Sequence, residues 1–257
     1  MLRPVLDPSP AEWIASRLGG AFGAACRTVP RGYPAYARIC HPAERDRGGW
    51  ASWSDAATET GRRAHGGMQW HAVVGSPDPV NLTGSLWRGT PPDRGNLPAH
   101  TLTALLAVLG DHTSTSDTWF CLWEGYGWAG STLSREHLDA PRLRHPGRDY
   151  VMFGGPLTAA TELGWRPRPS WFEAQSPNLF WPDDRAWCVA TEIDFDTTLV
   201  AGEEALIEAL VKTPSLEAWR IEPDTSLAAD ADLINGVGVT VSAVPAPPCP
   251  GRTRRGP

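Results

Sequence analysis

The sequence has almost no lysine and no long apolar run. Lys212 is the only lysine, and all other basic residues are arginines scattered along the chain. Lysine and arginine together number 23 against 29 acidic residues, so no basic face of the kind that binds nucleic acid is expected. No stretch of about 18 apolar residues is present, and no charged segment followed by an apolar run opens the chain. We therefore expect a cytoplasmic protein that binds neither nucleic acid nor a membrane.

The sequence also lacks the motifs of common catalytic and cofactor sites. Its 7 histidines do not have the HxH or HExxH spacing of zinc sites. The glycine-rich segments match neither a P-loop nor a dinucleotide-binding fingerprint, and GxSxG is absent. The 5 cysteines form no CxxC pair, and Cys121 and Cys188 lie in apolar patterns typical of strands. Buried free thiols are therefore expected, and no cofactor is predicted.

Tryptophan, by contrast, is abundant. The chain has 13 tryptophans among 257 residues, and such large side chains dominate whichever core or groove they enter. Trp171 and Trp181 lie in a proline-rich stretch, and Trp87 lies in the loop expected at residues 76–98. Exposed tryptophan beside proline can form a flat platform for sugars, peptides or a protein partner. The alternative is that these tryptophans fold back over the core beneath long loops.

The clearest strand prediction covers residues 187–196, WCVATEIDFD. Side chains of a strand alternate between its two faces. One predicted row is mostly apolar and should face the core: Trp187, Val189, Thr191, Ile193 and Phe195. The opposite row ends in three carboxylates: Glu192, Asp194 and Asp196. A solvated outer face is the simplest interpretation of this acidic row, because antiparallel sheets commonly leave one face in water.

The three carboxylates also suggest a binding surface. Neighbours on one face of a strand lie about 6.6 Å apart, so Glu192 and Asp194, or Asp194 and Asp196, could share one cation. In a cleft, such a row would require a metal, an arginine or a shifted pKa. Asp183, in the turn before the strand, either extends the acidic surface or solvates a bend.

Apolar periodicity predicts a mixture of helices and strands. Helices are expected at residues 7–18, 53–63, 97–110, 203–212 and 226–235, with a helical fragment at 157–163. Strands are expected at residues 36–39, 118–128, 148–156 and 216–221, besides 187–196. Residues 118–128 are apolar on both faces, which predicts a central strand covered on both sides. Residues 68–74 suggest a strand or an extended loop, and residues 166–178 a loop.

These elements predict an α+β fold. No linker interrupts the interior, so residues 1–236 are expected to form a single domain. Its mostly antiparallel mixed sheet should have about five or six strands, with helices packed on one face and long Pro/Gly-rich loops. Residues 237–257 are rich in proline and arginine, and we expect a disordered tail there.

Several segments resemble known proteins. Three of them, RDYVMFGGPL (148–157), QSPNLFWPDDRAWCVATEIDFDTTLVAG (175–202) and LEAWRI (216–221), resemble a group of uncharacterised bacterial hypothetical proteins. That resemblance extends over most of the chain, to about Asn235. Residues 144–150, RHPGRDY, are similar to the LP-x-x-Y-type segment that precedes a strand in SUKH-type immunity proteins. The second resemblance implies a single α+β domain that binds and blocks a toxin, and it carries over no functional residue.

Two functions follow as hypotheses. The first is an immunity-like protein-binding module, in which the three carboxylates contact a basic partner together with Trp171, Trp181 and Asp183. The alternative is a metal-dependent hydrolase or transferase. In that case Glu192, Asp194 and Asp196 would hold Mg²⁺ or Mn²⁺, and a histidine would act as general base. Whether the protein is an enzyme, and its oligomeric state, are left open.

Overall fold

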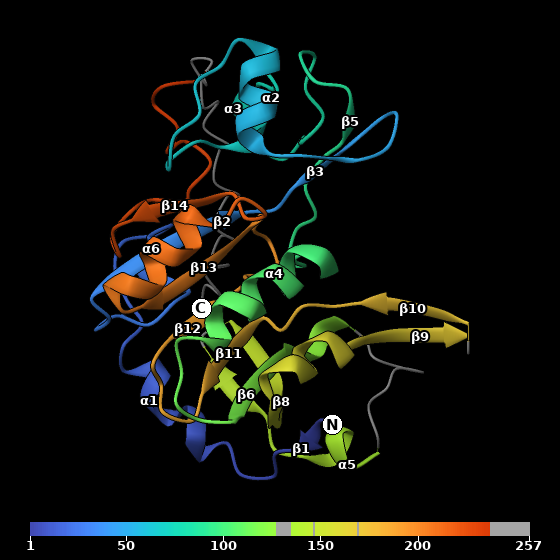
Figure 1. Cartoon of the computed structure of the whole chain (residues 1–257), viewed down its shortest axis with the longest axis vertical. Helices are drawn as coiled ribbons and strands as arrows, with labels where there is room; N and C mark the ends of the chain where they lie inside the picture. The colour runs from blue at the N-terminus through green and yellow to red at the C-terminus, as the bar shows by residue number, and fades with distance from the viewer. Residues whose placement is uncertain (127–134, 146, 169, 237–257) are drawn as a thin grey trace, which may run out of the picture.

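The computed structural model describes residues 1–126, 135–145, 147–168 and 170–236 (Figure 1). Its centre is a 9-stranded sheet. The strands follow in space as β1 (Arg3–Pro4), β8 (Arg148–Pro156), β6 (Asp117–Trp123), β11 (Leu179–Pro182), β12 (Cys188–Ala190), β13 (Thr197–Gly202), β2 (Ala35–Cys40) and β14 (Ala218–Ile221), with β7 (Leu143–His145) paired to β8. Every strand pairing in the described part of the chain is antiparallel. The α+β prediction is confirmed, although the sheet is larger than expected. The predicted tail at residues 237–257 lies outside the described residues.

Two helices cover one face of this sheet. They are α4 (Ala99–Gly110) and α6 (Glu204–Lys212), which lie against it in Figure 1. Leu105 of α4 and Leu210 of α6 are fully buried, in one cluster with Val189 and Val200 of the sheet. Both helices were expected from their apolar stripes, which this packing buries. No helix in the described part of the chain has the length and apolar character needed to span a membrane.

The other face of the sheet is covered as well, which corrects the prediction of helices on one face only. The N-terminal segment crosses it with a short helix, α1 (Glu12–Ala15), whose Ile14 is buried beside Tyr36 and Trp181. Strands β12 and β13 are buried at every position, so neither face could be left in water. The long helix predicted over residues 7–18 is reduced to α1 and the preceding 3-10 turn, η1 (Ser9–Ala11).

Residues 43–96 lie mostly above the sheet in Figure 1, in a region that we call the upper lobe. It contains β3 (Ala43–Arg45), β4 (Trp50–Ala51), α2 (Trp53–Thr60), α3 (Trp70–Val73) and β5 (Gly89–Thr90). Its core is built on three buried tryptophans, with ring centres 5.6 Å apart for Trp53 and Trp70 and 5.8 Å apart for Trp70 and Trp87. Helix α3 replaces the strand or loop expected at residues 68–74. All its residues are buried, so its sequence shows no helical periodicity.

Two further predictions were wrong about local structure. Residues 226–235 form turns rather than a helix, because the Asp232 carboxylate accepts the backbone N–H groups of Ile234 and Asn235. The proline-rich stretch expected as a loop contains the hairpin β9 (Gly164–Arg168) and β10 (Trp171–Ala174), which we call the β9–β10 arm. The remaining short elements are η2 (Ala25–Arg27), η3 (Glu124–Tyr126), α5 (Arg135–Asp139) and η4 (Leu157–Glu162).

The strand predicted at residues 187–196 ends early. Strand β12 stops at Ala190, and residues 191–196 form the turn that leads back into β13. The Phe195 N–H donates to the Glu192 carbonyl at 3.0 Å, which closes this turn, and the Phe195 carbonyl accepts from the Gly95 N–H at 2.8 Å. The three carboxylates therefore lie in a turn. The predicted outer strand face does not exist, because the chain must reverse for β13 to pair with β12.

We expect Gly95→Ala to destabilise the protein more than Gly61→Ala does. Both glycines have φ near 69°, so alanine at either site costs about 1–2 kcal/mol of left-handed strain. Only at Gly95 would the new Cβ also lie 2.6 Å from a backbone oxygen, that of Ile193. Overpacking should add about 1–3 kcal/mol there. Urea denaturation measures both losses, and equal losses would show that Gly95 does not brace the 191–196 turn.

Candidate functional site

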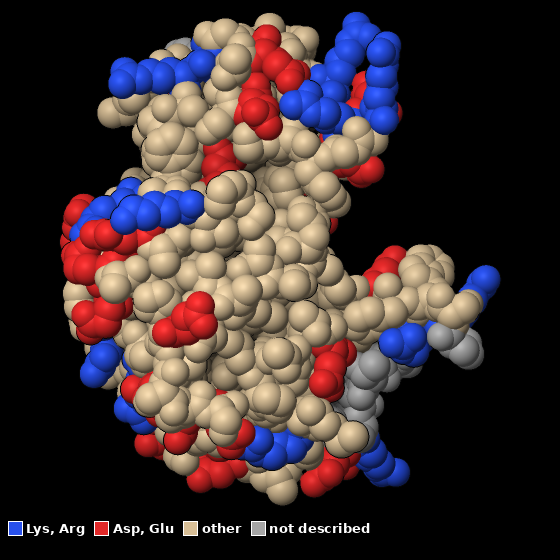
Figure 2. All heavy atoms as spheres, viewed as in Figure 1, with Lys and Arg blue, Asp and Glu red and all other residues tan. Residues whose placement is uncertain are grey.

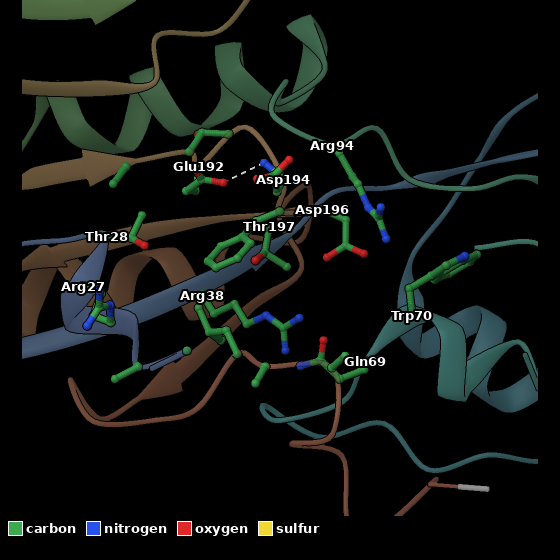
Figure 3. Close-up of a pocket in the computed structure, with 18 of the residues that line it drawn as sticks. Arg27, Thr28, Arg38, Gln69, Trp70, Arg94, Glu192, Asp194, Asp196 and Thr197 are labelled. Atoms are coloured by element: carbon green, nitrogen blue, oxygen red, sulfur yellow. Dashed lines mark hydrogen bonds between the residues drawn. The ribbon is translucent and has the colours of Figure 1, made fainter. Parts of the chain in front are cut away.

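A cavity of about 830 Å³ lies where the 191–196 turn meets the upper lobe and the N-terminal segment (Figure 3). Sites for small ligands typically enclose roughly 300–1,000 Å³. We call it the central cavity. Its charged lining residues are Arg27, Arg38, Arg94, Arg148, Glu192, Asp194 and Asp196. The three carboxylates singled out in the sequence therefore line one cavity, together with four arginines that sequence reasoning missed.

Arg148 of β8 binds two of the three carboxylates. Its guanidinium nitrogens lie 2.9 Å from the Glu192 carboxylate and 3.0 Å from that of Asp194. Glu192 also accepts the Asp194 backbone N–H at 2.7 Å, the contact dashed in Figure 3. A guanidinium therefore lies where the alternative hypothesis required a metal ion. Among the described residues, no group of three or more His, Cys, Asp and Glu side chains is placed to hold a metal ion.

Removing this guanidinium should loosen the turn. We expect Arg148→Met to lower the free energy of unfolding by about 1–2 kcal/mol, because it leaves the half-buried Glu192 carboxylate without its charged donor. Arg144→Met is the matched control. Arg144 is 86% exposed, its contact with Asp149 is 3.9 Å long, and its loss should cost under about 0.5 kcal/mol. Equal losses in the two variants, measured by chemical denaturation, would contradict this role of Arg148.

The third carboxylate, Asp196, has a different environment. Its side chain points into the central cavity between Arg94 and Arg38 (Figure 3). Burial raises the pKa of Asp196, and the positive charges of Arg38 and Arg94 oppose that rise only in part. Among the described residues, the Asp196 carboxylate forms no ion pair, and its hydrogen bonding is limited to its own backbone N–H. A carboxylate that faces two cations without contacting either leaves space for a group between them.

Arg38 is held rigidly in the floor of the cavity. It comes from β2, is 1% exposed and packs its guanidinium 5.0 Å from the centre of the Trp53 ring. Its Nη1 donates to the carbonyls of Gly66 and Met68, at 3.2 Å and 2.7 Å. In the described part of the chain, its Nε has no hydrogen-bond partner, and neither has Nε2 of the neighbouring Gln69. Buried donors without acceptors are rare in folded proteins, and a water or ligand oxygen that reached these two nitrogens would stabilise them.

The cavity also has apolar lining residues. Phe22 and Val80 line it and are 89% and 75% exposed, on the N-terminal segment and the upper lobe respectively, and the charged lining residues Arg27, Arg94 and Asp194 are exposed as well. Leu227 and Ala228 add further apolar surface. His71 also lines it, and burial lowers the pKa of this imidazole, which favours its neutral form. The cavity lining thus combines charged side chains, of which Arg38 is buried and Arg27, Arg94 and Asp194 are exposed, with apolar ones.

The other predicted binding residues lie elsewhere. Trp181 is 1% exposed and packs edge-on against Trp13 at 6.0 Å, so it belongs to the core, and Trp87 is buried as well. Trp171 is 47% exposed on the β9–β10 arm. Asp183 is exposed just beyond the end of β11 that is opposite the cavity, and it accepts the Trp119 indole N–H at 3.1 Å. The six predicted residues therefore do not form one surface.

The face drawn in Figure 2 has no continuous acidic area, because acidic and basic side chains are interspersed on it.

The expectation of buried free thiols is confirmed for Cys26, Cys40, Cys121 and Cys188. Burial raises the pKa of all four thiols, which makes them poor nucleophiles. Cys249 lies outside the described residues.

Comparisons of the chain with family models, with curated proteins and with solved structures find no match. The resemblances to bacterial hypothetical proteins and to SUKH-type immunity proteins therefore stay predictions.

Proposed function

We propose that the protein is a binding module for a small polar organic molecule, which it holds in the central cavity. One observation carries this proposal: the cavity lining includes buried side-chain nitrogens that have no hydrogen-bond partner among the described residues. Arg38 and Gln69 are 1% and 7% exposed, each with a nitrogen that donates to nothing, and Asp196 faces them.

Energetics supports this reading of the floor. A buried donor without an acceptor costs about 1–3 kcal/mol, and a poorly paired buried charge costs more. A fold that keeps two such donors and a facing carboxylate gains stability when a ligand or water completes them. Water can serve Arg38 and Gln69, but the exposed apolar lining residues Phe22 and Val80 suit an organic body better than bulk water.

A saturable organic probe tests the proposal. Anilinonaphthalene sulfonate has an anionic group and an apolar body, and its fluorescence rises in apolar sites. We expect it to bind the native protein at one site, with affinity lowered about tenfold by Arg94→Gln because this removes a cation of the cavity. Arg88→Gln is the control, since Arg88 is exposed and lies outside the cavity lining. Absence of saturable binding, or equal affinity in the two variants, would refute the proposal.

Protein binding is our second proposal, and the β9–β10 arm is the feature that favours it. Trp165 and Trp171 are 40% and 47% exposed, with ring centres 6.2 Å apart, and the arm projects from the body (Figures 1 and 2). The acidic contribution expected from the turn is weaker, because the Arg148 guanidinium pairs with both Glu192 and Asp194 and offsets one of their two negative charges. A basic partner therefore has less to bind than the sequence suggested.

Co-purification from the native cells tests this second proposal. We expect the double variant Trp165→Ser/Trp171→Ser to lose a partner of fixed stoichiometry that the Trp50→Ser variant retains. Trp50 is a suitable control because it is 51% exposed and lies on the upper lobe, away from the arm. The protein-binding proposal fails if no such partner is recovered or if the double variant keeps it.

A further inference from the structure

We propose that the ligand of the central cavity is a small zwitterion with an apolar side group, bound with its ammonium toward Asp196 and its carboxylate toward Arg38 and Arg94. Free α-amino acids and short peptides share this chemistry. The inference rests on the proposed function and specifies its ligand class.

The first support is the presence of both charge signs around one gap. Asp196 points between Arg94 and Arg38, and in the described structure it contacts neither of them (Figure 3). Arg148 is not available to a ligand in the same way, because its guanidinium binds Glu192 and Asp194. The charged groups around this gap without an ion-pair partner among the described residues are therefore one carboxylate, Asp196, and two guanidinium groups. Arg38 donates to the carbonyls of Gly66 and Met68, and Arg94 donates to the Pro79 carbonyl.

The second support is that a ligand of single sign fits this floor poorly. Two unit charges about 5 Å apart interact by about 3 kcal/mol at an effective dielectric near 20. A simple anion would gain from Arg38 and Arg94 but would be repelled by Asp196. A simple cation would gain from Asp196 but would be repelled by both arginines. A zwitterion oriented as proposed gains from all three.

The third support comes from buried N–H donors near the arginines that have no acceptor among the described residues. Gln69 Nε2 and Arg38 Nε are buried without acceptors, and the Gln69 side chain faces Arg38 (Figure 3). A ligand carboxylate at Arg38 would bring acceptor oxygens to this side of the cavity, either directly or through a bound water. Asp196 is an acceptor and cannot satisfy a ligand oxygen when ionised, so it is the complementary position for the ammonium.

The apolar part of the ligand would contact the apolar lining residues of the cavity. Leu179, Ala190, Phe195 and Leu227 line the cavity, and so do the exposed side chains of Phe22 and Val80. The volume of about 830 Å³ accommodates a short peptide as well as one amino acid. Each residue added to an extended peptide separates its terminal charges by about 3.5 Å more, so ligand length reports the spacing that the site prefers.

Calorimetric titration of the full chain tests the charge requirement. The probes are leucine, leucyl-leucine, N-acetyl-leucine, which lacks the ammonium, and leucinamide, which lacks the carboxylate. We expect at least one of the two zwitterions to bind about tenfold or more tightly than both blocked compounds. The stronger of leucine and leucyl-leucine then distinguishes an amino acid from a peptide.

Two charge-removing variants assign the ends of the ligand. Asp196→Asn should abolish the preference for leucine over N-acetyl-leucine, and Arg94→Gln should abolish the preference for leucine over leucinamide. Asp46→Asn and Arg88→Gln, at exposed positions outside the cavity lining, should preserve both preferences. If the dipeptide is the stronger zwitterion, the same variants are measured with its N-acetyl and amide derivatives.

The outcomes separate this inference from the proposed function. If N-acetyl-leucine or leucinamide binds as tightly as the zwitterions, the inference is overturned. It is also overturned if neither zwitterion binds at about 1 mM while anilinonaphthalene sulfonate binds normally, and the small-molecule function then survives. If the fluorescent probe fails as well, both proposals fail.

Discussion

Replacing Asp232 by alanine should lower the free energy of unfolding by about 3–5 kcal/mol, the loss typical of breaking a buried charged network. The side chain is 1% exposed and accepts five hydrogen bonds. The donors are the backbone N–H groups of Gln69, Ile234 and Asn235, Nδ2 of Asn235 and Nε2 of His65. Burial alone would raise the pKa of Asp232, but the hydrogen bonds from Asn235 and Gln69 outweigh it and leave the pKa lowered.

The network matters because it joins two distant parts of the chain. Asp232 belongs to the C-terminal turns, whereas His65 and Gln69 belong to the upper lobe, and Gln69 lines the central cavity. Asp230→Ala is the matched control, since Asp230 is exposed in the same segment, and we expect a loss under about 0.5 kcal/mol. Chemical denaturation measures both, and a loss below about 1 kcal/mol for Asp232→Ala would show that the network is dispensable.

The second large effect is a pH-dependent loss of stability due to His41. Burial lowers the pKa of this imidazole from 6.5 to about 4. Its Nδ1 donates to the Asp93 carbonyl at 2.7 Å, so Nε2 is the acceptor for the Thr198 hydroxyl at 2.9 Å. That hydroxyl also lies 2.8 Å from the hydroxyl of Thr191, at the cavity wall. Protonating Nε2 would convert this acceptor into a donor in a fully buried site.

The sign of the effect follows from the two pKa values. An unfolded chain binds a proton at His41 near pH 6.5, whereas the folded protein binds it only near pH 4. Between these values the unfolded state carries more protons, so His41 favours folding fully above pH 6.5 and progressively less as the pH falls to 4. The contribution lost is about 3 kcal/mol.

The measurement is the free energy of unfolding at several pH values between 7.5 and 4 for the wild type and for His41→Gln. Comparing the two removes the opposite contribution of buried carboxyls such as Asp196, whose pKa is raised. We expect the difference between wild type and variant to shrink by about 3 kcal/mol toward pH 4. His112→Gln, at a partly exposed position in the turn after α4, serves as the control substitution. A constant difference for His41→Gln would show that its ionisation does not affect folding.

The apolar pattern of the sequence correctly predicted two kinds of element: helices with one apolar face packed on the core, and strands buried on both faces. The stripe of α6, with Leu206, Ile207 and Leu210, is read directly at helical spacing, and all three are buried. The apolar run of β6 predicted a central strand, and β6 lies between β8 and β11. In each case, burial within a few residues is enough to select the conformation.

Predictions failed where a distant partner decides the conformation. The alternation from Trp187 to Phe195 favours a strand, but β12 ends at Ala190 because its neighbour β13 follows in the chain and must return antiparallel. Residues 226–235 favour a helix, but the Asp232 carboxylate competes for the backbone N–H groups and binds the upper lobe. Trp181 and Trp171 share a proline-rich sequence context, yet one is in the core and the other on an exposed arm.

By itself, the sequence determined the α+β class and the burial of four cysteines, and it identified Glu192, Asp194 and Asp196 as candidate site residues. Its composition also determined that nearly every cation would be a guanidinium. Tertiary structure alone decided which charges meet: Arg38, Arg94 and Arg148 come from distant segments, and no spacing along the chain reveals that they surround those carboxylates. Helix and strand patterns reflect contacts between near neighbours, whereas the central cavity depends on side chains brought together only when the sheet and the upper lobe pack.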